Sequence, residues 1–197
     1  MKRYKVKKKL GFLRLLFLLA LTLFLLYFLV GEGKAELLKK VYPIKYGEYV
    51  ESYAEEYSVD KYLVYAIIKT ESGFDPDAVS NVGAKGLMQV MEKTAAEVNE
   101  KEGFGYAIPE DLYDPEKNIR IGCCYLKKLM DTYSDAVLAI TAYNGGTGNV
   151  RKWLKDKNLS DGEGGLSTIP YKETDNYVKK VMKAYDMYIK LYKTSEI

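Results

Sequence analysis

The 197-residue sequence contains no histidine and only two cysteines. The absence of histidine excludes Ser-His-Asp and Cys-His catalytic arrangements and most catalytic zinc sites. The cysteines, Cys123 and Cys124, are adjacent, so they cannot form a four-cysteine zinc site or connect distant segments. We interpret them as small buried helix residues, with a redox pair or an adjacent disulfide as the alternatives. We expect neither a metal nor a cofactor.

Acidic residues are absent from positions 1–9, which are rich in lysine and arginine, and the apolar segment 10–30 is interrupted only by Arg14 and Thr22. About 20 apolar helical residues span a bilayer, so we predict a transmembrane anchor over 10–30. Its basic flank, 1–9, is expected to stay cytoplasmic, with the rest of the chain outside. A cleaved signal peptide ending near 33–35 is the alternative and gives the same export. Basic residues beside a membrane span usually set topology, so we do not predict nucleic-acid binding.

Strict alternation of apolar and polar residues is also absent after the apolar segment, whereas helical spacing recurs. We therefore predict an all-α fold, with a charged stalk over 31–44 and one helical domain over 45–197. Asp60 and Asp114 have the sequence context of helix N-caps, and Gly73 that of a helix terminator. The helices are expected over 46–57, 61–72, 91–101, 115–133, 135–144, 147–157 and 172–192, with a glycine-rich loop over 160–170.

Glu71 ends the most apolar of these predicted helices. The helix dipole and the apolar neighbours both raise the pKa of a carboxyl placed there, which suits a general acid for glycosidic cleavage. The ordinary alternative is a solvated glutamate near a helix end. A second catalytic carboxylate is not evident, because Asp75 and Asp77 resemble turn residues. A site with one acid can still cleave a glycosidic bond when the substrate supplies the nucleophile.

Four blocks of sequence resemble the lytic transglycosylases of the soluble-lytic-transglycosylase type. They are Glu71-Ser72, SNVGAKGLMQ over 80–89, AYNGG over 142–146 and IPYKETDNYV over 169–178. They occur in the family's order and at similar spacing, between about 46 and 192. Gly145 stands where the family more often has alanine, and Thr147 where proline is common. Both differences fall in a loop.

The resemblance implies a lysozyme-like helical fold and cleavage of the MurNAc-β-1,4-GlcNAc bond in peptidoglycan glycan strands. In the family, one glutamate protonates the glycosidic oxygen and then takes the proton of the MurNAc 6-hydroxyl, which leaves a 1,6-anhydroMurNAc end. By position this glutamate is Glu71. The substrate-binding positions implied in the same way are Ser80, Met88, Gln89, Tyr143, Asn144, Glu173 and Tyr177.

The resemblance also implies a role for each position. Ser80 and Gln89 would bind the sugars flanking the cleaved bond, and Met88 would line the groove. Tyr143 would contact the reacting sugar or orient the acid. Asn144 would hold the loop or an acetamido group, while Glu173 and Tyr177 would close the groove.

Structural alternatives remain open for several of these side chains. Met88 and Tyr177 could be core residues, Asn144 a helix cap, and Glu173 a first-turn residue favoured by the helix dipole. Ser80 could be an ordinary loop residue. For the whole protein the alternatives are a hydrolytic muramidase of goose-lysozyme type and an inactive peptidoglycan-binding scaffold. An envelope-remodelling or conjugation-type machine is suggested as the setting by analogy alone.

Overall fold

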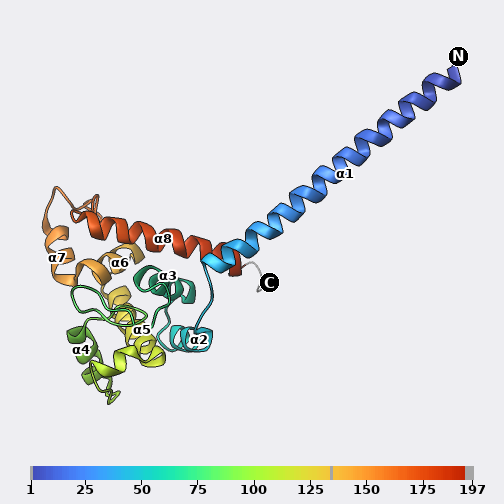
Figure 1. The fold of residues 1–197 in the computed structure, drawn as a ribbon. Helices are drawn as coiled ribbons and strands as arrows, with labels where there is room; N and C mark the ends of the chain where they lie inside the picture. Colours follow the sequence, from blue (N-terminus) through green and yellow to red (C-terminus); the bar gives the residue numbers. More distant parts are fainter. Residues whose placement is uncertain (1, 134, 194–197) are drawn as a thin grey trace. The chain divides into compact units, whose positions relative to one another are not determined.

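In a computed structural model, the chain is described over residues 2–133 and 135–193, without the side chains of 2–15 and 28–32. It divides into two compact units, Met1–Pro43 and Ile44–Ile197 (Figure 1). The elements are α1 (Lys2–Val41), α2 (Gly47–Glu56), α3 (Lys61–Glu71), α4 (Glu92–Glu102), the 3₁₀ helix η1 (Glu110–Tyr113), α5 (Pro115–Thr132), α6 (Ala136–Gly145), α7 (Thr147–Lys155) and α8 (Lys172–Tyr192).

The first unit is a single helix, α1, which continues to Val41. The charged segment over 31–44, which we predict to be a stalk, is thus helical as far as Val41. Its composition suits a helix: Ala35, Glu36, Leu37 and the following lysines are all good helix formers, and no proline occurs before Pro43.

The prediction of a transmembrane helix over 10–30 is wrong. Within the residues that the structure describes, no helix is both long and apolar enough to cross a membrane. Predicted positions 10–15 and 28–30 lie outside the described side chains.

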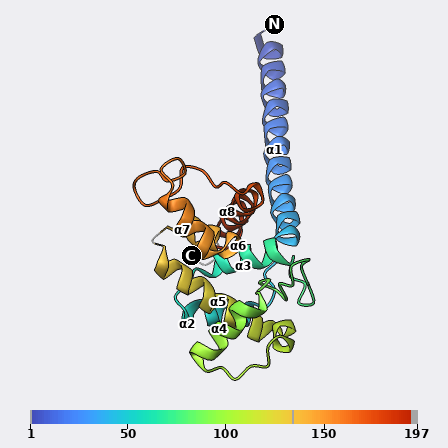
Figure 2. The same ribbon diagram turned by 90° about the vertical axis from the view of Figure 1, so that its left-hand side faces the viewer.

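The second unit is built around α3, whose side chains are buried at every position from Tyr62 to Ile68. A carboxylate oxygen of Asp60 accepts a hydrogen bond from the Tyr62 amide at 2.8 Å, as its N-cap position predicts. α3 packs mainly against α8, which is amphipathic and buries Tyr177, Val181 and other residues of one face (Figures 1 and 2). Glu71, the last residue of this helix, is partly buried.

The helical predictions for this unit are confirmed, with ends within two residues of the observed bounds. Within the described residues, β structure is limited to three isolated bridges. The all-α fold class is therefore what the structure shows. The element that the sequence did not predict is η1, which connects the end of α4 to the start of α5.

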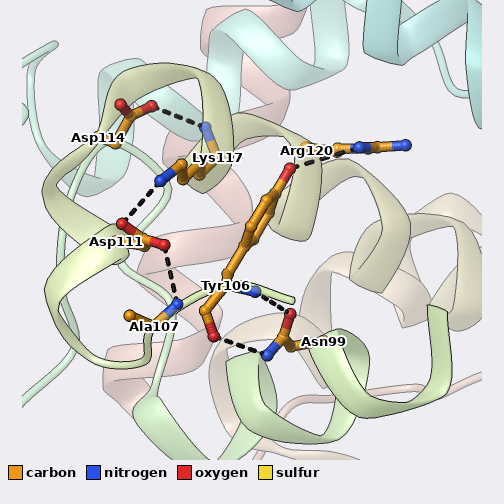
Figure 3. Close-up of polar contacts among 7 residues, drawn as sticks. All are labelled: Asn99, Tyr106, Ala107, Asp111, Asp114, Lys117 and Arg120. Carbon is orange, nitrogen blue, oxygen red and sulfur yellow. Dashed lines mark hydrogen bonds and ion pairs between the residues drawn. The ribbon is translucent and has the colours of Figure 1, made fainter. Parts of the chain in front are cut away.

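Polar contacts hold this connection to the helices on both sides (Figure 3). Asn99 of α4 accepts a hydrogen bond from the Tyr106 amide at 2.9 Å and donates one to its carbonyl at 3.0 Å. On the α5 side, Lys117 donates to Asp111 at 2.7 Å. Asp114 caps α5 by accepting from the Lys117 amide at 3.0 Å. These bonds fix η1, which supplies a backbone carbonyl to the site described below.

The two cysteines lie on α5 and are free thiols. Cys123 is fully buried, as predicted for a small helix residue in the core. Burial raises the pKa of Cys124 to about 11, which keeps this half-buried thiol protonated at neutral pH. The structure gives no support to a redox pair or to an adjacent disulfide.

Candidate active site

Glu71 is the last residue of α3, and the backbone turns sharply after it. Gly73 adopts the left-handed conformation (φ 62°), as its terminator role requires, and Phe74 follows in the same region (φ 70°). A bulky residue with this φ is strained, by roughly 1–3 kcal/mol. Phe74 is nevertheless buried, and its amide donates a hydrogen bond to the Ser72 hydroxyl at 3.1 Å. The chain is thus held in a fixed path beyond the carboxyl group.

Ser72 connects the end of α3 to the polar segment that follows. Its hydroxyl lies 2.8 Å from the carbonyl oxygen of Leu87 and 3.1 Å from that of Ile68, and donates to these acceptors. The Leu87 contact joins residues fifteen positions apart. The second residue of the Glu-Ser pair is therefore a structural link, a role that the sequence analysis did not assign.

Residues 78–90, called here the site loop, form a compact structure without a regular strand. Lys85 pairs with both Val79 and Val90 in isolated antiparallel bridges. At the tip, the Ser80 amide donates to the Ala84 carbonyl, and the Ser80 hydroxyl accepts from the Ala84 amide, each at 2.9 Å. Figure 1 shows the chain between α3 and α4 winding back over the middle of the unit. The Ser80 hydroxyl thus closes a turn.

Asn118, on the buried face of α5, anchors the site loop through hydrogen bonds. Its side chain is fully buried, accepts from the Met88 amide at 2.8 Å, and donates to the carbonyls of Lys85 (3.0 Å) and Leu112 (2.8 Å). Gly86 lies against this junction with φ 74°, and an added Cβ would be 2.2 Å from the Leu112 oxygen and 2.3 Å from the Asn118 amide nitrogen. Only glycine fits, because both the φ value and the space exclude a side chain.

Tyr143 of α6 and Tyr177 of α8 lie close to Glu71. The Tyr143 hydroxyl donates to the Met88 carbonyl at 2.8 Å. Burial raises the pKa of each tyrosine well above its usual value, and the charge of Glu71 is the second cause. The Tyr177 hydroxyl is buried and makes no hydrogen bond of ordinary geometry within the described residues. Residues predicted from three separate sequence blocks thus meet at one carboxyl group.

Burial raises the pKa of Glu71 from 4.5 to about 7, and its interaction with the Tyr177 hydroxyl acts in the opposite direction. The Tyr177 hydroxyl faces this carboxyl group outside ordinary hydrogen-bond geometry. The carboxyl group is therefore divided between its protonated and ionised forms near neutral pH. A group in this state can both donate and accept a proton, which is what acid–base catalysis requires.

Two predicted substrate contacts need correction. Met88 is fully buried and packs against α5, where its sulfur lies 2.2 Å from the position that a Cβ on Gly122 would take. It therefore belongs to the core and does not line a groove. Tyr177 is also buried, at 8% exposure, so it faces Glu71 from within the core instead of closing the groove from outside.

Gln89, Asn144 and Glu173 differ in how much of their hydrogen-bonding capacity remains free. The Gln89 backbone is left-handed (φ 48°), and its side-chain nitrogen donates to the carbonyls of Ala78 and Gly86, both at 2.9 Å. Its side-chain oxygen remains an acceptor. Asn144 and Glu173 are exposed and, within the described part of the chain, form neither hydrogen bonds nor ion pairs through their side chains.

Asn118 and Gly122 are the site-forming residues that the sequence analysis missed. Both fall on the buried face of α5, together with Ile119, Leu126 and Leu129. A polar residue on the apolar face of a predicted helix was the available signal, because buried amides need hydrogen-bond partners. Its partners lie 30 and 33 positions away in the sequence, so the pattern alone could not identify them.

The chain matches a family model described as the transglycosylase SLT domain over residues 48–163. It is 35% identical over 158 residues to the soluble lytic murein transglycosylase of Escherichia coli K12, covering 79% of this chain and 24% of that protein. Membrane-bound lytic murein transglycosylase C of Edwardsiella ictaluri is 44% identical over 124 residues, covering 57% and 34%.

The solved structures show the same relationship. The structure of an inactive Glu-to-Gln mutant of the lytic transglycosylase Slt from Pseudomonas aeruginosa superposes with a TM-score of 0.69 at 36% identity, covering 76% of this chain and 24% of that one. This chain thus spans about a quarter of the length of the soluble relatives that it matches. The matched segment contains Glu71, the site loop and Tyr143, and it occupies more than half of the sequence. The chain therefore belongs to the transglycosylase SLT domain family.

Proposed function

We propose that this protein is a peptidoglycan lytic transglycosylase that cleaves the MurNAc-β-1,4-GlcNAc bond and leaves 1,6-anhydroMurNAc ends. The observation that carries the proposal is one partly buried carboxyl, Glu71 at the end of α3, with its pKa raised by burial to about 7. Asp75, the nearest acid in sequence, accepts a hydrogen bond from the Asp77 amide at 3.0 Å in an exposed turn. Among the described groups, no carboxylate contributes to the pKa shift of Glu71.

One acid–base group suits an intramolecular reaction. Protonated Glu71 would donate its proton to the glycosidic oxygen as the bond from that oxygen to C1 of MurNAc breaks. The resulting carboxylate would take the proton of the MurNAc 6-hydroxyl while the oxygen of this hydroxyl forms a new bond to C1. No water is consumed, and Glu71 regains its proton. General acid–base catalysis of this kind contributes roughly 10²–10⁴-fold to the rate.

The surroundings of Glu71 support both halves of this cycle. Burial favours the neutral acid that begins the reaction, whereas the interaction with Tyr177 favours the carboxylate that acts as base. Tyr143 would act mainly as a positioning residue, since its hydroxyl is bonded to Met88 of the site loop. The free oxygen of Gln89, the Ser80 hydroxyl, Asn144 and Glu173 remain our proposed sugar contacts.

The relatives support the same substrate class. Two of them are named as murein transglycosylases, and replacement of one glutamate by glutamine gives an inactive form of the Pseudomonas aeruginosa protein. Because peptidoglycan lies outside the cytoplasmic membrane, we propose that the catalytic unit works there.

The product masses test the proposed reaction. Digestion of purified sacculi with the full-length protein should release muropeptides lighter, by one water, than those with reducing MurNAc ends. A hydrolytic muramidase would give reducing ends, and a binding scaffold would release nothing. Either result would contradict the transglycosylase proposal. A parallel digest with a hydrolytic muramidase supplies the reference masses.

The pKa of Glu71 predicts the pH dependence of the reaction. Because the protonated carboxyl starts the cycle, kcat/KM should fall about tenfold per pH unit above pH 7. Tyr177→Phe removes an interaction that lowers the Glu71 pKa, so this limb should move to higher pH. The check is a kcat/KM profile of both proteins from pH 5 to 9. A limb that stays in place or moves to lower pH in the variant would contradict the role of Tyr177.

A further inference from the structure

A second feature near the site is a cavity of about 600 Å³ between α4, α5 and the start of α7. Its walls include Lys93 of α4, Tyr125 and Lys128 of α5, and Thr147 and Arg151 of α7. We call it the basic cavity. Glu97 is the single acidic residue among the side chains that line it.

The cations of the basic cavity are not neutralised. Lys93, Lys128 and Arg151 are exposed, and none forms an ion pair within the described part of the chain. Other lysines on the same helices do have acidic partners, as Lys127 has Asp131. Three unpaired cations around one concave surface produce a positive potential stronger than that of isolated surface charges.

The start of α7 adds to this potential. Its N-cap, Gly146, has no side chain to bond the first amides, and the first turn contains no acid. The positive end of the helix dipole is therefore left uncompensated beside Thr147. The dipole reinforces the side-chain cations, which are the principal feature of the cavity.

One pair of aromatic rings connects the basic cavity to the catalytic carboxyl. Tyr125 lines the cavity, and its ring lies 5.5 Å from that of Tyr143, centroid to centroid. Tyr143 is bonded to the site loop and senses the charge of Glu71. The wall of the basic cavity is thus in ring contact with a residue of the site.

We propose that the basic cavity binds the carboxylates of the peptide stems that peptidoglycan glycan strands carry. This inference rests on the proposed function. Each MurNAc residue bears its stem through a lactyl ether, so an anionic peptide projects beside the reacting sugar. The sugars themselves offer few charges for a basic pocket to bind. The cavity would thus favour strands with stems over bare strands.

The test compares one double variant, Lys128→Gln with Arg151→Gln, on three substrates. These are soluble glycan strands with intact stems, strands with their stem carboxylates amidated, and strands stripped of stems by an amidase. We expect kcat/KM to fall about 5- to 10-fold on intact strands, because each exposed charge contact contributes up to about fivefold. On amidated and stripped strands the variant should stay within twofold of the parent.

The matched control is Lys152→Gln with Lys155→Gln, which removes two exposed cations of α7 outside the basic cavity. It should behave like the parent on all three substrates. Equal losses on intact and stripped strands, no loss on intact strands, or the same loss in the control would each overturn the inference. Formation of anhydro ends by the parent protein on stripped strands distinguishes failure of this inference from failure of the proposed function. A protein that is not a transglycosylase would form no anhydro ends on those strands.

Discussion

Glu71→Gln should lower kcat for glycan cleavage by about 10³-fold, within the range that general acid–base catalysis contributes. Glutamine keeps the shape of the side chain but can neither donate the proton to the glycosidic oxygen nor take one from the 6-hydroxyl. The measurement is the rate of anhydro-end formation at saturating substrate. Asp77→Asn, which neutralises an exposed carboxylate in the turn after Gly73, is the control and should retain parental activity. Comparable losses in the two variants would contradict the assignment of Glu71.

The same substitution should stabilise the protein at high pH. The pKa of Glu71 is raised from 4.5 to about 7, so between these values the folded state holds more protons than the unfolded state. Stability therefore decreases as pH rises through this window, and above pH 7 a buried charge remains. Glu71→Gln should raise the free energy of unfolding at pH 8 by up to about 3 kcal/mol and change it little at pH 4. Urea unfolding at the two pH values measures the difference, and an equal effect at both would contradict the pKa shift.

Gly86→Ala should destabilise the catalytic unit by about 3–5 kcal/mol. The new Cβ would lie 2.2 Å from the backbone oxygen of Leu112 and 2.3 Å from the Asn118 amide nitrogen, and the φ of 74° disfavours any side chain. The Leu112 atom is a backbone oxygen, and the Asn118 side-chain amide is hydrogen-bonded through both its oxygen and its nitrogen. Neither group can move away without breaking these interactions. Thermal and urea unfolding of the variant give the measurement.

Gly83→Ala is the control for this substitution. Gly83 lies in the same site loop with φ 88°, but no atom is found within 4 Å of its added Cβ. It should lose only about 1 kcal/mol, the ordinary effect of left-handed backbone on an alanine. If the two variants were equally stable, the close packing at Gly86 would not contribute to the stability of the site loop.

The helices and the position of Glu71 could be predicted because their signals are local. Asp60 and Asp114 mark helix starts by bonding amides two or three residues ahead, and Gly73 ends α3 through its own φ. The site loop could not be predicted in the same way. The core position of Met88 depends on Gly122, whose missing side chain makes room for it on a helix 34 positions further along.

The prediction for the N-terminal segment failed for a different reason. The prediction of a membrane span rested on the hydropathy of residues 10–30 and did not include a continuation of the helix into the charged residues that follow. Lys34, Glu36, Lys39 and Lys40 carry high helix propensity, so α1 continues through them. Hydropathy alone did not indicate where the helix would end.

The anchoring of the site loop decides when its conformational entropy is lost. Ser72 at the end of α3, Asn118 of α5 and Tyr143 of α6 bond the loop before any substrate is present. A loop fixed in this way loses its backbone freedom when the chain folds, so ordering it does not weaken the binding of a glycan strand. It also cannot act as a lid, because both the amide and the carbonyl of Met88 are already bonded. Adaptation to different strands must therefore come from the sugar or from surfaces outside this loop.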